Sequence, residues 1–299
     1  MMDMLRFKFS SIFFGFFVIF NLQSNAHGVL FFSEEARQHG KEWAESDALF
    51  SPVGRVFIED SEGMASGSGT VFKNDRVLTA AHVIRGARRV FFSFTGRIED
   101  SIPVSGYVKK EDVDLAVLKL EHPVSLDGVT LPLIAKVDPK KFSQMIWDSI
   151  PSAPGLPFTR EFALAGFGRV RSLSPLSVEM PSGVKHAGMT FLNSSPTRLR
   201  RDEATGNAVV RSSLYLGVGA QSEAGASMFT TCSISQDFPA CSRGGDSGGP
   251  LFTRNLSGKK QWQLVGVLTN SDASGTGSLV SILTPDLENL LFTESFEQF

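Results

Sequence analysis

Short apolar runs separated by turn-forming residues, between about residues 50 and 135, limit the fold of this chain more than any other feature. The runs hold three to six residues rich in Val, Phe, Ile and Leu, and they lie at 55–58, 70–72, 76–79, 90–94 and 115–120. Gly, Ser, Asn and Asp separate them, and we expect turns at 66–69 and 74–75. Runs this short and this closely spaced, with few segments of helical period, predict an all-β sandwich or barrel.

A second β-rich region extends from about residue 161 to 283, and its clearest predicted strands are 162–165, 213–216 and 263–268. Pro- and Ser-rich residues 137–160 separate the two regions and are typical of a connection between domains. The segment 284–291 begins with Thr-Pro, a good helix start, and then places three Leu residues on one helical face. We therefore expect two β units followed by a short C-terminal helix.

Composition and charge exclude several classes of protein. Of the 299 residues, 42% are hydrophobic and 20% are charged, which is an ordinary globular mixture. The net charge of −2 offers no electrostatic basis for binding nucleic acid or an anionic membrane surface. The one dense basic run, at 198–201, is interpreted as a solvated loop.

The first 26 residues have the three-part layout of a secretory signal peptide. Two basic residues, Arg6 and Lys8, precede the apolar run 12–20, and small residues at 24 and 26 suit cleavage after Ala26. The alternative is a membrane anchor, but the mostly apolar stretch 9–22 is only 14 residues long, short of the ~20 needed to cross a bilayer. The sequence thus predicts an exported, secreted or periplasmic protein without a stable membrane anchor.

Export also changes the interpretation of the two cysteines, Cys232 and Cys241. In an oxidising compartment a disulfide between them is expected, and two free buried thiols are the alternative. Two thiols without a nearby histidine are too few to hold a metal ion.

Ser247 lies between glycines in the stretch SRGGDSGGPL, at 242–251. This stretch fits the G-x-S-x-G elbow of α/β-hydrolases, in which the catalytic histidine follows the serine. All five histidines precede Ser247 in this chain, namely His27, His39, His82, His122 and His186. The elbow interpretation therefore fails, whereas the chain order His, Asp, Ser remains open.

Three motifs in that order resemble those of the trypsin/chymotrypsin-like serine proteases. They are LTAAH ending at His82, DLAVLKL beginning at Asp114, and GDSGGP around Ser247, spaced 32 and then 133 residues apart. The segments 165–169 and 266–271 also resemble, respectively, the stretch that opens the second barrel and the strand that pairs with substrate. The likeness covers about residues 50–295 and points to the bacterial exported trypsin-like or glutamyl-endopeptidase-like branch.

The resemblance implies an all-β fold of two chymotrypsin-like six-stranded barrels, with the active site in the cleft between them and a short C-terminal helix. The expected division of the chain, in order, is a signal peptide (1–26), an N-terminal arm or propeptide (27–48), the N-terminal barrel (49–136), the interdomain connection (137–160), and the C-terminal barrel with its helix (161–299).

The resemblance also assigns the catalytic roles. Ser247 is the expected nucleophile, His82 its general base, and Asp114 the carboxylate that orients the imidazole. Asp112 is the alternative carboxylate, because on a strand it would face the same side, but the apolar run begins directly after Asp114. The backbone N–H groups of Gly245 and Ser247 form the implied oxyanion hole, and neither metal nor cofactor is needed.

The resemblance indicates only a few residues that would bind substrate and select the cleavage position. Thr269, Asn270 and Ser271 are expected to bind substrate, with Thr269 also donating to Asp114. By the same resemblance, Cys241 and Ser242 are expected at the specificity pocket. Cys241 lies six residues before Ser247, where trypsin has its pocket-base aspartate, and a loop insertion that shifts this register is the alternative. No carboxylate occurs from 238 to 245, so a small or apolar side chain at the cleavage position is expected rather than Lys or Arg.

The resulting hypothesis is a monomeric exported serine endopeptidase that cleaves proteins or peptides. Two alternatives remain open: a catalytically inactive protease-fold binding protein, and an esterase that uses the same triad.

Overall fold

A computed structural model shows the fold. It describes residues 30–31, 34–135, 137, 162–168, 171–172, 183–190, 199–201, 208–210, 217–218, 226–231, 240–241, 245–254, 261–271 and 277–299. The predicted signal peptide, nearly all of the connection 137–160, the predicted strand 213–216, and Cys232 lie outside these residues, so the predicted disulfide does too.

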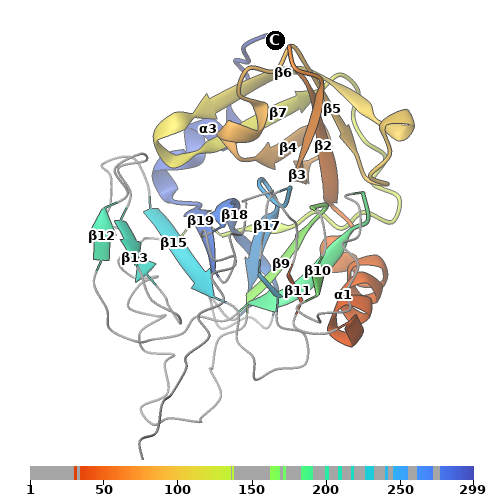
Figure 1. Cartoon of the computed structure of the whole chain (residues 1–299). Coiled ribbons are helices and arrows are strands. Elements are labelled where there is room, and N and C mark those ends of the chain that lie inside the picture. The colour runs from red at the N-terminus through yellow and green to blue at the C-terminus, as the bar shows by residue number, and fades with distance from the viewer. Residues whose placement is uncertain are drawn as a thin grey trace, which may run out of the picture.

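The N-terminal half is a closed antiparallel barrel, as the short apolar runs predict (Figure 1). Its strands are β2 (Val53–Glu59), β3 (Met64–Lys73), β4 (Arg76–Thr79), β5 (Arg89–Ser93), β6 (Ile102–Lys110) and β7 (Leu115–Leu120). They follow the order β2-β3-β4-β7-β6-β5, and pairing of β5 with β2 closes the cylinder. Closure leaves the barrel without free sheet edges.

Alternate residues of these strands fill the barrel. Val56, Val71, Val77, Phe92 and Leu118 are fully buried in one cluster. Because successive side chains of a strand point to opposite faces, this alternation fixes the pairing register. The barrel therefore gives the chain segments at its strand ends a rigid support.

The predicted turn at 66–69 is wrong, because these residues lie inside β3. Their glycines allow close packing rather than a change of direction. A Cβ atom at Gly67 would lie 2.8 Å from Val83 Cγ1 and 2.9 Å from the carbonyl oxygen of Ser247. A Cβ atom at Gly69 would lie 2.6 Å from Val77 Cγ1.

The second half is built on an eight-stranded sheet (Figure 1). Its strands are β8 (Leu133–Ile134), β9 (Phe162–Gly166), β11 (His186–Thr190), β14 (Gly217–Val218), β15 (Ala226–Thr231), β17 (Pro250–Thr253), β18 (Gln263–Ser271) and β19 (Gly277–Ile282). The main order is β11-β9-β17-β18-β19-β15-β14, and β8 pairs with β18. Within the described residues this part is a sheet, whereas the expectation was a second six-stranded barrel.

Two small sheets accompany it. β1 (Leu30–Phe31) lies between β10 (Arg171–Ser172) and β16 (Ala240–Cys241), and β12 (Leu199–Arg201) pairs with β13 (Ala208–Val210). The mostly β architecture confirms the predicted fold class.

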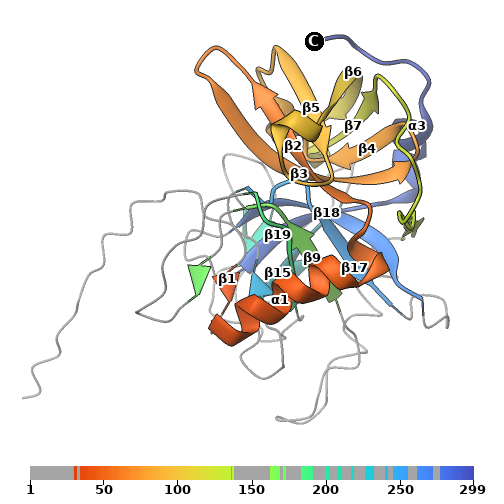
Figure 2. The same ribbon diagram turned by 90° about the vertical axis from the view of Figure 1, so that its right-hand side faces the viewer.

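A helix that the sequence analysis did not predict, α1 (Glu34–Ser46), packs along β11 beside the second sheet (Figure 2). It leads into the short 3₁₀ helix η1 (Ala48–Phe50), where Asp47 accepts hydrogen bonds from the Leu49 amide at 2.9 Å and from Trp43 Nε1 at 3.0 Å. Phe50 is fully buried, and its ring meets that of Trp43 at 4.8 Å between centroids. The segment expected as an arm or propeptide thus contributes to the core.

The predicted C-terminal helix is present as η5 (Pro285–Leu287) followed by α3 (Glu288–Phe292). Beyond it, residues 293–299 return to the first barrel, where the backbones of Tyr107 and Glu297 exchange two hydrogen bonds of 2.8 Å (Figure 1). Arg76, which is 1% exposed, lies 2.7 Å from Glu294 and also donates to the Thr293 carbonyl. We refer to residues 293–299 as the C-terminal strap.

Candidate active site

His82 and Asp114 are brought together by the pairing of β4 with β7. Thr79, the last residue of β4, is opposite Ala116 in β7. His82 follows β4 in the short 3₁₀ helix η2 (Ala81–Ile84), and Asp114 directly precedes β7. Adjacent strand ends therefore place two residues that are 32 positions apart side by side.

Asp114 has an unusual backbone conformation. Its φ of 51° and ψ of 47° are left-handed, and no other non-glycine residue in the described part of the chain has a positive φ. Aspartate tolerates this region better than most residues. The turn follows the 3₁₀ helix η4 (Glu111–Val113), so Asp112 and Asp114 do not share a strand face as expected, and Asp112 is exposed.

Both carboxylate oxygens of Asp114 accept hydrogen bonds from His82. Oδ1 lies 2.8 Å from the His82 backbone nitrogen, and Oδ2 lies 2.7 Å from ring atom Nδ1. When Nδ1 carries the proton, Nε2 of the neutral imidazole is free to accept another. The two side chains are 33% and 27% exposed, so the ring remains accessible to a substrate.

Ser247 lies in a tight loop, 245–249, that leads into β17. Gly245 and Gly248 have φ of 94° and 87°, which glycine adopts at little cost. Hydrogen bonds to β18 hold the loop: Gly248 N donates to Leu268 O at 2.7 Å, and Leu268 N donates to Gly249 O at 2.8 Å. The Ser247 loop is thus attached to the second sheet.

The same loop also contacts the first barrel. The backbone nitrogen of Ser68 in β3 donates to Ser247 O at 2.7 Å. Gly67 packs closely against both Ser247 O and the side chain of Val83, the residue after His82. The structure therefore brings Ser247 close to the histidine segment, although these described residues include no hydrogen bond between Ser247 and His82.

Asp246, next to the proposed nucleophile, is fully buried. Its Oδ1 accepts from the Gly168 amide at 3.0 Å, and a Cβ atom at Gly166 would overlap this oxygen. The glycines of the 165–169 motif therefore make room for a buried carboxylate and supply it with an N–H donor. That carboxylate anchors the Ser247 loop to the end of β9.

Ser68 is a site residue that the sequence analysis missed. Its Oγ donates to the Gly245 carbonyl at 3.0 Å and accepts from the Phe167 amide at 2.9 Å. Thr79 Oγ1 donates to the Ser68 carbonyl at 2.7 Å. The only sequence signal was the Gly-Ser-Gly composition of 66–69, which also suits a turn.

The expected specificity residues are placed only in part. Thr269 is buried in β18, beside an irregularity in the pairing with β19, and Asn270 and Ser271 end the same strand. Cys241 belongs to β16, and Ser242 lies outside the described residues. A hydroxyl from the second sheet does reach the aspartate segment, since Ser281 Oγ donates to the carbonyl of Val113. The roles of Thr269 and the other substrate-binding residues stay predictions.

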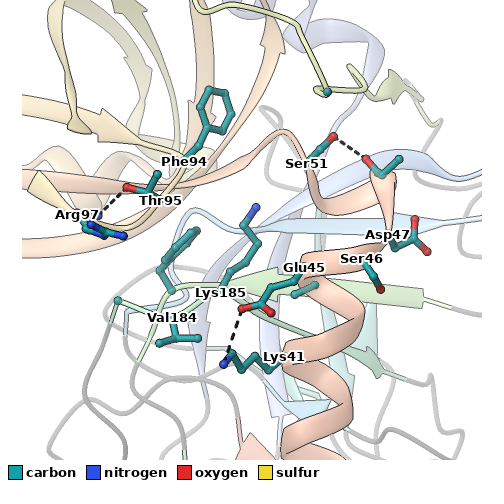
Figure 3. A pocket seen from close by; sticks show the side chains of 15 residues that line it. Lys41, Glu45, Ser46, Asp47, Ser51, Phe94, Thr95, Arg97, Val184 and Lys185 are labelled. Atoms are coloured by element: carbon teal, nitrogen blue, oxygen red, sulfur yellow. Dashed lines mark hydrogen bonds and ion pairs between the residues drawn. The ribbon is translucent and has the colours of Figure 1, made fainter. Parts of the chain in front are cut away.

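A recess of about 680 Å³ lies apart from the candidate triad (Figure 3). It is bordered by α1, η1, the turn at 183–185 and the loop at 94–97. Lys185 lines it and donates from Nζ to the Phe50 carbonyl at 2.9 Å; burial lowers the pKa of this amine to about 8. The next residue, His186, is 1% exposed, and burial lowers its pKa to about 4. His82, Asp114 and Ser247 do not line this recess.

In the ranges that the structure describes, His, Cys, Asp and Glu side chains form no group of three or more that could hold a metal ion. The helices of those same ranges include none with the length and apolar character required to cross a bilayer.

A closed β-barrel, a second sheet, a His–Asp pair at adjacent strand ends and a serine on an adjoining loop together form the arrangement expected of an all-β serine hydrolase. The family profile of the trypsin-like peptidase domain matches residues 67–267, and the chain belongs to this family. The protein is accordingly a serine-type endopeptidase, as the three motifs predict.

Solved structures of proteases resemble the chain at low sequence identity. The active form of the Rv3671c protease from M. tuberculosis is 18% identical, with a TM-score of 0.49 and 84% of each chain covered. An HL collagenase is 15% identical, with a TM-score of 0.49 over 79% of this chain and 90% of the other. The thermostable serine protease AL20, from an extremophilic microorganism, is 15% identical, with a TM-score of 0.44 over 81% and 96%. Comparison with curated protein sequences gives no significant match.

Proposed function

We propose that this peptidase is exported and cleaves proteins through an acyl-enzyme intermediate, with His82, Asp114 and Ser247 as its catalytic triad. The observation that carries the proposal is the double attachment of Asp114 to His82, through the ring at 2.7 Å and through the backbone at 2.8 Å. This pair of bonds sets both the tautomer and the orientation of the imidazole, which is the role of the triad aspartate.

The proposed reaction has two halves, formation of an acyl-enzyme and its hydrolysis. Ser247 Oγ attacks the substrate carbonyl carbon while His82 Nε2 takes the hydroxyl proton. As the C–N bond breaks, His82 returns that proton to the departing amine, leaving an ester on Ser247. A water molecule, activated by the same histidine, then hydrolyses the ester and restores the serine hydroxyl. Asp114 stabilises the imidazolium present in each half of the cycle.

Backbone N–H groups of Gly245 and Ser247 are proposed to bind the oxyanion of the tetrahedral intermediates. The left-handed φ of 94° at Gly245 supports this role, because a side chain would be strained there. Loss of one such donor typically costs on the order of 10²–10³ in rate.

Export through the signal peptide 1–26 remains part of the proposal, with a secreted or periplasmic destination and a Cys232–Cys241 disulfide. The cleavage preference is proposed to be a small or apolar side chain, bound with help from Thr269, Asn270 and Ser271.

The test is intact mass spectrometry of the exported protein after reaction with a fluorophosphonate probe, beside Ser247→Ala. We expect one adduct on the wild type and none on the variant, with the N-terminus near His27 and no free thiols. Digestion of an unfolded protein substrate by the same preparation separates an endopeptidase from an esterase. A folded wild type that takes no adduct would refute the triad and favour the inactive binding protein.

A further inference from the structure

Ser68 forms hydrogen bonds to both Gly245 and Ser247, the two residues whose N–H groups form the proposed oxyanion hole. Its side chain donates to Gly245 O at 3.0 Å, and its backbone nitrogen donates to Ser247 O at 2.7 Å. It is 177 residues from Gly245 in the sequence and belongs to β3 of the first barrel. The two halves of the fold are thus joined at the loop that would stabilise the transition state.

The Ser68 hydroxyl both donates and accepts a hydrogen bond within the protein. It is 0% exposed, donates its proton to Gly245, and accepts from the Phe167 amide at 2.9 Å at the end of β9. A hydroxyl can donate and accept at once, whereas a methyl group does neither and a thiol does both weakly. Of the small side chains, serine suits this position between a carbonyl and an amide.

The carbonyl of Gly245 needs such a partner because glycine has many accessible conformations. Holding this carbonyl restricts rotation about the Cα–C bond of Gly245, next to the N–H group of the same residue. The Ser68 backbone bond restricts Ser247 in the same way. Loop preorganisation of this kind is what makes oxyanion donors effective.

We propose that Ser68 is a positioning residue for the loop 245–249, which carries the proposed oxyanion hole, and that it acts through its hydrogen bond to Gly245. This inference rests on the proposed function, since it assigns a role within that triad enzyme. Ser68 does not touch the substrate. Its effect falls on kcat, because the oxyanion forms only after substrate has bound.

The test compares Ser68→Ala with Ser93→Ala, which removes the same hydroxyl from an equally buried serine of the same barrel. Ser93 is 1% exposed, and its Oγ lies 3.1 Å from Thr95 Oγ1 and forms no hydrogen bond to the described residues 245–249. Each protein is titrated with fluorophosphonate, and kcat and KM are measured on an activated ester. Hydrogen exchange of the peptide covering 245–249 and thermal unfolding are measured on the same samples.

For Ser68→Ala we expect kcat to fall about 10- to 100-fold, below the full loss of a donor, with KM changed less than about twofold. Exchange at 245–249 should accelerate in this variant. Ser93→Ala should keep the wild-type kcat and loop exchange, even where its unfolding temperature falls as far. Ser68→Cys places a larger, weakly donating thiol at the same position and takes the place of Ser68→Ala if that variant does not fold.

Three results would overturn the assignment. One is a kcat within twofold of the wild type in the Ser68 variants; another is an equal fall in Ser93→Ala. Failure of both Ser68 variants to fold would give Ser68 a purely structural role. A wild type that takes no probe identifies a different failure, that of the proposed function itself.

Discussion

Replacing Asp114 by Asn gives the sharpest test of the proposed triad. In the structure, Oδ1 of Asp114 accepts from the His82 backbone N–H, which can only donate, while Oδ2 accepts from Nδ1. The amide oxygen of Asn must therefore remain on the backbone side, and its NH₂ group must face the ring. The ring then accepts at Nδ1 and carries its proton on Nε2, where it cannot receive the proton of Ser247.

The alternative amide orientation points NH₂ at the His82 N–H and costs about 1–3 kcal/mol for an unsatisfied donor. The wrong tautomer is therefore the favoured one. We expect kcat/KM to fall about 10⁴-fold, the loss found for this change in a related triad, which corresponds to about 5 kcal/mol of transition-state stabilisation. The overall fold should be retained.

The assay is the rate of fluorophosphonate labelling and of ester hydrolysis, with circular dichroism as the folding check. Asp112→Asn is the matched control, since Asp112 is exposed two residues away and should leave the rate within about twofold. The reasoning is refuted if Asp114→Asn keeps activity within tenfold of the wild type, or if the control variant shows the larger loss.

Three further outcomes are expected. Gly166→Ala drives a methyl group into the Asp246 carboxylate and should destabilise the fold by about 1–3 kcal/mol and lower probe labelling; equal thermal unfolding of variant and wild type would contradict this. Burial lowers the pKa of His186 from 6.5 to about 4 in the folded protein, so between pH 6.5 and 4 this histidine is protonated in the unfolded chain and neutral in the folded one. The free energy of unfolding therefore falls by up to about 3 kcal/mol as the pH decreases through this range. In urea unfolding, His186→Gln should lose less stability than the wild type between pH 6.5 and 4. His122→Gln changes an exposed site and should keep the wild-type dependence of stability on pH. An unchanged pH dependence in both variants would exclude His186 as its source. Deleting the C-terminal strap, 293–299, should lower the unfolding temperature, because it removes Glu294 and the Thr293 carbonyl, two partners of the buried Arg76. An unfolding temperature equal to that of the full chain would show that the strap adds no stability.

Local sequence patterns were sufficient for much of the fold. Runs of β-branched and aromatic residues marked the barrel strands, because a pleated, half-buried strand selects such side chains. The Thr-Pro start and the leucine spacing of 284–291 marked the terminal helix. Short motifs also pointed to His82 and Asp114, which the structure joins by two hydrogen bonds, and their catalytic role stays a prediction.

Other local signals were misleading. The Gly-Ser composition of 66–69 is typical of a turn, yet these residues continue β3 because Ser247 and Val83 pack directly against Gly67. Helix α1 has few apolar residues in its sequence, and it is held by packing against β11 and by the Trp43–Phe50 contact. In both cases tertiary contacts outweighed local preference.

By itself, the sequence determined the all-β class, the terminal helix and the peptidase family, and it pointed to the two residues that the structure joins as a His–Asp pair, because each depends on a short run of residues. The tertiary structure alone decided which distant groups meet. Ser68 reaches Gly245 across 177 positions, and Arg76 reaches Thr293 across 217. Such pairs arise when the barrel closes and the second sheet packs against it, and their partners are set by burial and strand register rather than by any neighbouring residues in the chain.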